Sequence, residues 1–443
     1  MNQSLHAGLD VCARRLEPAS RAPVAVAFSG GGDSLALLLV ARAWAASCGR
    51  PLVALHVDHG LQAESGAWAV QAQAMAERLD VPLRVLRWDG PKPTSGLPAA
   101  AREARHRLLA EAAREAGAQV LLVGHTLDDQ LENAVMRGAG APVGPLREWS
   151  PSPAWPQGRG LYLCRPLLAA RRGALRAWLV AEGLDWIDDP ANADLRYARA
   201  RARRALDGAV PLDPGPDIRA LASACRPTSW GGFEIDRTAL LAAPPPQALR
   251  LLQAALACAS GAPALARPAR ARDLVQRLQA GEAFTATLAG ARLEAAGAIV
   301  ICREAGEAAR GGLQPLMLEA GRPAVWDGRF EITVSEPGWT VHALSGQASR
   351  LDEADRARLR AIPAAARPSM PVLSRRGPLA GVVRLALGGR DDHIEATSGR
   401  FRPLGGERFA GAADLVAVES EIGTIAHMAN SQPPSYVQAV GKD

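Results

Sequence analysis

One stretch near the N-terminus constrains the fold more than any other part of the chain. Residues 24–28 are apolar and predict a strand buried on both faces, and residues 35–41 resume as an apolar helix. Glycines between them let backbone N–H groups turn inward and approach an anion at the positive end of the helix dipole. The sequence therefore predicts a site for phosphate or pyrophosphate, formed by Ser29, Gly30, Gly31, Gly32, Asp33 and Ser34.

Asp33 is an unusual residue for a phosphate-binding loop. A Walker-type loop has a longer glycine spacing and ends in Gly-Lys-Ser/Thr, whereas this loop contains no lysine. An acidic side chain beside bound phosphates is explained best by a divalent metal that it holds, so Asp33 is a candidate Mg²⁺ ligand. The alternative is a plain Gly-rich turn between a strand and a helix.

Length and composition exclude several classes of protein. A chain of 443 residues is too long for one ordinary core, so we expect two or three domains. No apolar run approaches a membrane span and the first nine residues lack a secretory signal pattern, so we expect a cytoplasmic protein with no membrane partner. Six scattered cysteines argue against a zinc site, a CxxC redox motif or a disulfide framework. The net charge of +6 permits a polyanionic partner.

Strands alternate with helices over the first part of the chain. This order predicts βαβ units and a doubly wound parallel sheet, an α/β fold in which ligands bind beyond the carboxyl ends of the strands. Polar residues follow three of the expected strands, at 29–33, 56–59 and 124–129. We expect a leading helix within residues 1–21, strands at 24–28, 51–57, 81–88 and 119–123, and helices at 35–41, 65–79, 99–116, 126–137 and 171–182.

Composition shifts predict the domain boundaries. We expect a first domain at residues 1–212, a mainly helical domain at 213–311 and a small α+β domain at 312–443. Residues rich in Gly, Pro and Ser at 138–160 predict one long mobile loop, and residues 422–443 predict a poorly ordered tail. Within the second domain we expect helices at 218–225, 246–260 and 269–280, and a hairpin at 283–294 followed by a strand at 299–303.

Two short polar segments follow predicted strands. His56, Asp58 and His59 could ligate a metal, but no further partner lies nearby at a ligand spacing, so a polar rim that positions a ligand is favoured. In the second segment Thr126 and Asp129 predict a capping box, which leaves His125, Asp128 and Glu132 unexplained. Several carboxylates near bound phosphates would repel them unless a metal bridges the two, which again indicates Mg²⁺.

Arginine carries nearly all of the positive charge, because the chain has only two lysines. Arg102 and Arg105 are three residues apart on a predicted helix and suit either a solvated surface or a phosphate contact. A denser group follows later, where unpaired like charges would destabilise a helix unless a polyanion such as a nucleic-acid backbone offsets them. A solvated face is the alternative for this group, which comprises Arg196, Arg199, Arg201, Arg203 and Arg204.

Taken in order, these segments resemble the PP-loop ATP pyrophosphatases and, within that superfamily, the tRNA(Ile)-lysidine synthases. The resemblance spans residues 24–204 and departs from the family pattern at 199–203, where Arg-Ala-Arg-Ala-Arg replaces an RNRIR-like run, and at 143–146, which lacks a GLxGM-like form. The matching motifs are SGGxDS at 29–34, HVDHGL at 56–61, ARxxRY/H at 101–106, HxxDDQxE at 125–132, RPLL at 165–168 and DPxN at 189–192.

The resemblance implies a two-step ligation on a tRNA base. ATP would adenylate the C2 oxygen of the wobble cytidine of tRNA(Ile) with a CAU anticodon, and the amine of L-lysine would then displace AMP to give lysidine. Codon reading would change from AUG to AUA, and tRNA identity from Met to Ile. A cytoplasmic enzyme is implied, and a homodimer is compatible with the resemblance.

The resemblance also implies residue roles. Catalytic residues would be Asp33, His125, Asp128 and Asp129, of which the last three would orient the lysine amine or take its proton, while Asp33 would hold Mg²⁺. The five clustered arginines and the C-terminal domains would bind tRNA. ATP would bind to Ser29, Gly30, Gly31, Gly32, Asp33, Ser34, His56, Asp58 and Arg105.

Three other functions are weighed against this one. A tRNA thiolase of the same superfamily commonly needs a CxxC pair, which this chain lacks. A PP-loop enzyme that amidates or ligates a small metabolite would need neither the clustered arginines nor two further domains. A non-catalytic tRNA-binding protein with a relic ATP fold would not need four residues that this chain keeps, which are Asp33, His125, Asp128 and Asp129.

Overall fold

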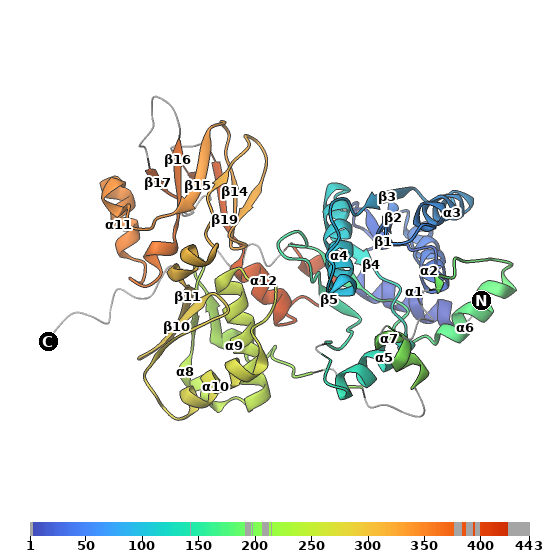
Figure 1. The fold of residues 1–443 in the computed structure, drawn as a ribbon, viewed down its shortest axis with the longest axis horizontal. Coiled ribbons are helices and arrows are strands. Elements are labelled where there is room, and N and C mark those ends of the chain that lie inside the picture. The colour runs from blue at the N-terminus through green and yellow to red at the C-terminus, as the bar shows by residue number, and fades with distance from the viewer. Residues whose placement is uncertain are drawn as a thin grey trace. The chain divides into compact units, whose positions relative to one another are not determined.

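A computed structural model of the protein divides the chain into two units (Figure 1). It describes residues 3–141, 143–190, 196, 198–205, 212–213, 215–375, 383–386, 393–394 and 399–423. One unit comprises Met1–Gly215 with Val416–Ile422, and the other is formed mainly by Pro216–Leu415. The division follows Gly215, close to the expected boundary after residue 212. The expected boundary between residues 311 and 312 lies inside the second unit and stays a prediction.

The first unit is built on a six-stranded sheet, which confirms the predicted doubly wound α/β fold. Neighbouring strands are parallel except for β5, which pairs antiparallel with β6. In spatial order the strands are β3 (Leu83–Arg87), β2 (Leu52–Asp58), β1 (Val24–Ala27), β4 (Val120–Leu122), β6 (Tyr162–Cys164) and β5 (Trp149–Pro151).

Helices cover both faces of this sheet. Helix α4 packs on the face that presents Ala25, Leu55 and Leu121, so alternate strand residues are buried beneath it. On the other face α2 contacts β1 and β2 and packs against both α1 and α6. The helices are α1 (Gln3–Arg15), α2 (Gly32–Cys48), α3 (Ser65–Arg78), α4 (Leu97–Glu115), α5 (Leu127–Gly138), α6 (Arg172–Ala181) and α7 (Ala198–Arg204).

The strand order creates a crevice between β1 and β4. The chain leaves β1 toward β2 on one side, whereas β4 lies on the other side, which makes this the switch point where such sheets bind ligands. Gly124 permits the close approach, because a Cβ atom there would lie 3.1 Å from the backbone oxygen of Asp33. The residues that follow β4 are therefore held beside the start of α2.

The structure corrects several sequence predictions. Residues 138–160 are not one long loop, because β5 forms at Trp149–Pro151 and pairs with β6, a strand that the sequence did not predict. The predicted helix at 218–225 is wrong. Its end is β7 (Cys225–Pro227), which pairs with β8 (Phe233–Ile235), and only a 3-10 turn at Ala222–Ala224 precedes it. Of the expected tail, Ile422 is buried and Gly423 is exposed, while residues 424–443 lie outside the described part of the chain.

The second unit contains two hydrophobic cores. The first surrounds the buried helix α9 (Pro245–Ser260) and includes Phe409 from α12 (Gly405–Ala412). The predicted helices at 246–260 and 269–280 are confirmed, but a five-stranded antiparallel sheet accompanies them. The remaining elements of this part are α8 (Arg237–Ala242), α10 (Pro268–Gln279), β9 (Thr285–Leu288), β10 (Ala291–Ala295) and β11 (Ile299–Arg303).

The second core lies between two small antiparallel sheets and is centred on Trp326, Phe330 and Phe401. Sheet order is β12-β15-β16-β17 in one and β13-β14-β19-β18 in the other. Their strands are β12 (Leu316–Met317), β13 (Ala324–Trp326), β14 (Phe330–Thr333), β15 (Trp339–Ala343), β16 (Pro371–Arg375), β17 (Val383–Leu385), β18 (His393–Ile394) and β19 (Gly399–Pro403), with α11 at Glu353–Arg360.

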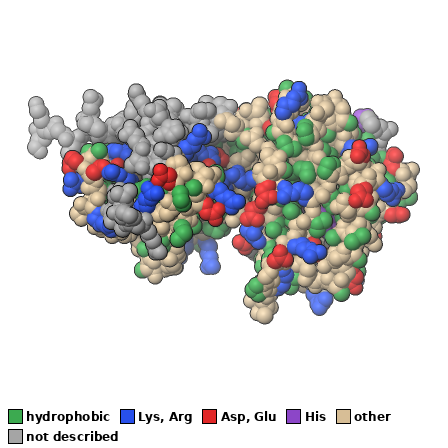
Figure 2. Space-filling view, turned by 90° about the horizontal axis from the view of Figure 1, so that it is seen from above, with side chains coloured by type: hydrophobic (Ala, Val, Ile, Leu, Met, Phe, Trp, Pro, Cys, Tyr) green, Lys and Arg blue, Asp and Glu red, His purple; other side chains and the backbone are tan. Residues whose placement is uncertain are grey.

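Charges of both signs are mixed on the face of the molecule that Figure 2 draws. On the face drawn in Figure 2, Lys and Arg side chains alternate with Asp and Glu side chains. Exposed ion pairs such as Arg84 with Glu115 account for part of this mixing. All six cysteines are free, and none of the described helices is long and apolar enough to span a membrane.

A late segment of the chain completes the first unit. Residues Val416–Ile422 belong to it, and Glu419 forms an ion pair with Arg50 in which both side chains are almost fully buried. Arg50 also donates hydrogen bonds to the backbone oxygens of Glu17 and Ala22. The pair therefore joins the end of α1, the end of α2 and the returning segment.

We expect Glu419→Gln to destabilise the protein by about 3 kcal/mol or more, because it leaves the buried Arg50 charge without a counter-ion. Unfolding in urea of the full chain, followed by tryptophan fluorescence, measures this. The matched control is Glu115→Gln, whose exposed ion pair with Arg84 is worth less than about 1 kcal/mol. Equal effects of the two substitutions would contradict the prediction.

Candidate active site

Hydrogen bonds of its own serines fix the conformation of the loop after β1. The Ser34 hydroxyl donates to the Gly31 carbonyl at 2.8 Å and accepts from the Ser29 backbone N–H at 3.2 Å. Gly30 has a φ of 82°, and Ile187 lies so close that a Cβ at Gly30 would meet its side chain at 2.4 Å. The Ile187 N–H also donates to the Gly30 carbonyl at 3.0 Å. The positive φ and the short distance to Ile187 explain why glycine is required at position 30.

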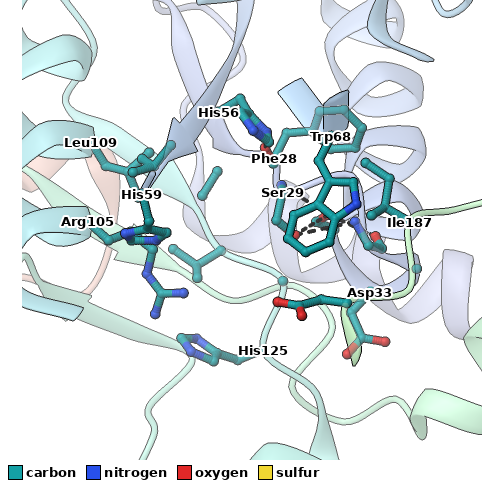
Figure 3. A pocket seen from close by; sticks show the side chains of 18 of the residues that line it. Phe28, Ser29, Asp33, His56, His59, Trp68, Arg105, Leu109, His125 and Ile187 are labelled. Carbon is teal, nitrogen blue, oxygen red and sulfur yellow. Dashed lines mark hydrogen bonds between the residues drawn. The ribbon is translucent and has the colours of Figure 1, made fainter. Parts of the chain in front are cut away.

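This loop borders a cavity of about 450 Å³ at the switch point of the sheet. In Figure 3, Arg105 and His59 lie on one side of it and Trp68 and Ile187 on the other, with Asp33 and His125 also facing it. Gly30, Asp128, Arg196, Arg201 and Arg204 are not among the lining residues. The predicted site residues that do line the cavity are Ser29, Gly31, Gly32, Asp33, Ser34, His56, Asp58, Arg105, His125, Asp129, Arg199 and Arg203.

Asp33 has one paired and one unpaired oxygen. Its Oδ2 accepts a hydrogen bond from Arg172 Nε at 2.8 Å, whereas Oδ1 is buried and has no hydrogen-bond partner. Burial raises the pKa of the Asp33 carboxyl above its ordinary value, and Arg172 opposes that shift. A buried carboxylate oxygen without a partner fits a ligand of Mg²⁺. Among the described residues no group of three His, Cys, Asp or Glu could hold a metal, so its other ligands would have to be phosphate oxygens and water.

Arg172, at the start of α6, is the central cation of the site. Besides Asp33, its guanidinium pairs with Asp129 at 3.3 Å and with Glu132 at 3.0 Å. Its backbone N–H donates to Asp128 Oδ2 at 2.7 Å. One arginine thus ties the first turn of α2 to the first turns of α5.

Helix α5 presents the carboxylates of the site. The predicted capping box is confirmed, because Asp129 Oδ2 accepts from both the backbone N–H and the hydroxyl of Thr126, at 2.8 and 2.9 Å. Asp129 Oδ1 remains for Arg172. Asp128 holds the start of α6 instead of lining the cavity. The carboxylate of Glu132 is fully buried among Arg172, Arg199 and Arg203.

The clustered arginines divide into two groups. Arg203 donates to Glu132 at 2.8 Å, and Arg199 lies 3.5 Å from Glu132 and donates to Asn133 at 3.0 Å. For these two the prediction of unpaired charge is wrong, because α5 supplies the counter-ions. The second group is exposed and comprises Arg196, Arg201 and Arg204.

Arg105 and the histidines complete the cavity wall. Arg105 forms no hydrogen bond or ion pair with any residue in the described part of the chain, and burial lowers its pKa to about 10, so it stays protonated. His56 Nδ1 lies 3.0 Å from the Phe28 carbonyl, and burial lowers the pKa of its imidazole. Asp58 Oδ1 accepts from the Gly60 N–H at 2.9 Å and so shapes the turn after β2. A cation without a partner in a cavity fits an anionic ligand.

Comparisons with known proteins agree with this geometry. A family model described as the PP-loop domain matches residues 9–209. The chain is 50% identical to the tRNA(Ile)-lysidine synthase of Caulobacter vibrioides, over 92% of this chain and 97% of that protein. It is 37% identical to the tRNA(Ile)-lysidine synthase of Hyphomonas neptunium, over 62% of this chain and 79% of that protein. The chain belongs to the tRNA(Ile)-lysidine synthase family.

Membership of the tRNA(Ile)-lysidine synthase family implies the use of ATP. The PP-loop domain is an ATP-using domain, and the whole anion-binding wall described above lies inside the matched residues 9–209. Most of the residues that the sequence motifs singled out line this cavity. The motifs did not include Arg172. Its position at the predicted start of a helix was a signal, because the helix dipole disfavours a cation there unless carboxylates surround it.

The raised pKa of Asp33 has a consequence for stability. Because the folded-state pKa exceeds the ordinary value of 3.8, the folded protein binds the Asp33 proton more tightly than the unfolded chain. Ionisation of Asp33 therefore lowers the free energy of unfolding. This loss is absent at pH values below the ordinary pKa, grows as pH rises, and is complete above the folded-state pKa. We expect Asp33→Asn to stabilise the ligand-free protein at pH 7.5, by an amount that shrinks toward pH 4.5. Thermal unfolding across this range measures it, and a loss of stability at pH 7.5 would contradict it.

Proposed function

We propose that the protein ligates L-lysine to C2 of the wobble cytidine of tRNA(Ile) with a CAU anticodon, through an adenylated cytidine, with release of pyrophosphate and AMP. The observation that supports this most directly is the single cavity that joins an anion-binding loop to a cluster of carboxylates. The loop and Arg105 suit the phosphates of ATP. Asp129 suits the amine that must attack the base. A relative that is 50% identical to this chain is named for this reaction.

The loop positions the group that leaves first. Backbone N–H groups of residues 30–32 and the N-terminus of α2 suit the pyrophosphate of ATP. Arg105 adds a cation to the opposite wall, where negative charge develops during adenylation. Mg²⁺, bound to Asp33 and to the phosphates, would supply charge neutralisation as the bond between the α- and β-phosphates breaks.

Lysine and tRNA are assigned to other parts of the unit. Asp129 lines the cavity from the first turn of α5, so it can accept a hydrogen bond from the lysine amine or take its proton. The exposed residues Arg196, Arg201 and Arg204 suit the tRNA backbone. The cytosine has to leave its stack to enter the cavity. A cytoplasmic location and a homodimer remain predictions.

Two other functions fit the site less well. No cysteine is among the residues that line the cavity, which disfavours a thiolase. A non-catalytic tRNA-binding protein would gain nothing from a buried, partly unpaired Asp33, because such a group costs stability.

Incorporation of labelled lysine tests the function. We expect the purified full chain with ATP, Mg²⁺ and labelled lysine to label a tRNA(Ile) transcript with a CAU anticodon, and not a CAU tRNA(Met) transcript. Asp33→Asn should abolish the product while tRNA affinity stays within about twofold, because an asparagine cannot hold the metal as a carboxylate does. Absence of tRNA-bound label with the unaltered chain, or labelling without ATP, would overturn the proposal.

The division of the clustered arginines gives a second test. We expect Arg201→Ala combined with Arg204→Ala to weaken tRNA binding and to reduce its dependence on salt by about two units of slope, because two phosphate contacts are lost. Filter binding at several salt concentrations measures this. Arg199→Ala combined with Arg203→Ala is the matched comparison, and it should lower the rate of ligation as well, because it removes two counter-ions of the buried Glu132. Identical behaviour of the two pairs would contradict the division.

A further inference from the structure

His125 is held by a residue outside its own motif. It follows β4, is 8% exposed, and lines the cavity. Its Nδ1 atom lies 3.1 Å from Nε of Arg165, which follows β6 and is 6% exposed. Arg165 also donates to the Arg147 carbonyl at 2.6 Å and to the Ser150 hydroxyl at 3.0 Å. Three hydrogen bonds therefore fix the guanidinium against the imidazole.

The Arg165 contact determines where the imidazole carries its proton. A guanidinium can only donate hydrogen bonds, so the atom that faces it has to accept, and Nδ1 of His125 therefore carries no proton. A neutral imidazole has one N–H group, which must then lie on Nε2. Addition of a second proton is opposed by burial and by Arg165, Arg105, Arg102 and Arg199, which together hold the pKa of His125 well below its ordinary value.

Asp129 also lines the cavity, and its carboxylate accepts hydrogen bonds from Thr126 and pairs with Arg172. The only nitrogen of His125 left for a ligand is Nε2, and it has no partner in the described part of the chain. That nitrogen already bears a proton, so it cannot accept one from a lysine amine.

We propose that His125 acts as a hydrogen-bond donor to an oxygen acceptor of the reacting groups, and that Arg165 is the positioning residue that fixes this tautomer. The inference rests on the proposed function and deepens it. His125 and Asp129 then have different roles. Asp129 is the acceptor suited to the amine proton, whereas His125, like Arg105, contacts negative charge. Donors placed where negative charge develops stabilise a transition state.

Two oxygens have the required chemistry. A phosphoryl oxygen of ATP is anionic throughout, and the C2 oxygen of cytosine is the atom that bonds to phosphorus during adenylation. Both accept a hydrogen bond from Nε2–H. Binding of ATP alone separates them, since only the first oxygen is present without tRNA.

His56 provides an internal reference for the tautomer. Its Nδ1 lies 3.0 Å from the Phe28 carbonyl, and a carbonyl oxygen can only accept. His56 therefore carries its proton on Nδ1, the reverse of His125. Both rings line the same cavity, so one spectrum should show two opposite tautomers.

Long-range ¹H–¹⁵N NMR of the full chain, labelled at histidine, tests the tautomer directly at pH 7. We expect His125 to be protonated at Nε2 only and His56 at Nδ1 only, with the signals assigned by their loss in His125→Asn and His56→Asn. Ser150→Ala removes one contact of Arg165 but not the contact with His125, and it should leave the His125 tautomer unchanged. Arg165→Met should let both His125 tautomers appear. Protonation of His125 at Nδ1 in the unaltered protein would overturn the proposal even if Arg165→Met does not fold.

Amide substitutions test the donor role in the reaction. The N–H of a glutamine side chain reaches the Nε2 position, whereas an asparagine places its amide near Nδ1. We expect His125→Asn to slow single-turnover ligation by about 10² to 10³-fold, the usual loss of one such donor, and His125→Gln to keep at least about tenfold more of the rate. Equal losses in the two variants would indicate a base and overturn the proposal.

Equilibrium binding of ATP without tRNA then identifies the acceptor. Weaker binding in His125→Asn than in His125→Gln assigns the phosphoryl oxygen, and equal binding with slower ligation assigns the C2 oxygen. If the unaltered chain forms no lysidine, the proposed function fails, while the NMR spectrum still decides the tautomer.

Discussion

The site depends on one guanidinium. Arg172 pairs with Asp33 from α2 and with Asp129 and Glu132 from α5, so three carboxylates that would repel one another meet around a single cation. Two of these carboxylates are almost completely buried. Removal of the cation would leave buried charges without counter-ions, which costs several kcal/mol per group. The close approach of α5 and α6 to the loop after β1 therefore requires this residue.

The residues around Arg172 form two electrostatic groups. The loop N–H groups, Arg105 and the neutral ring of His125 form the first group, which offers donors and positive charge to the cavity. Asp129 and Glu132 form the second group, and arginines of α6 and α7 hold them. A reaction between an adenylated base and an amine needs both groups, because the departing oxygens are anionic and the amine sheds a proton.

The sequence predicted those parts of the fold that depend on neighbouring residues. The strands and helices up to residue 137, the capping box of Thr126 with Asp129, and the anion loop all follow from local patterns. The pairing of Arg172, Arg199 and Arg203 with α5 could not be predicted, because it depends on how segments about forty to seventy residues apart pack together. Strand β6 was missed because Tyr162–Cys164 is too short to show a period, and β7 because its pairing with β8 outweighs the helical propensity of an Ala-rich segment.

The use of arginine in place of lysine suits this chemistry. A guanidinium stays protonated when it is buried, as Arg105 and Arg165 show with pKa values lowered only to about 10, whereas a buried lysine readily becomes a neutral amine. A neutral amine of the protein would compete with free lysine for the adenylated base. No lysine is among the residues that line the cavity, and Lys92 lies instead over the ring of Trp88. A cavity whose cations are all arginine therefore suits phosphates without adding a second nucleophile to the reaction.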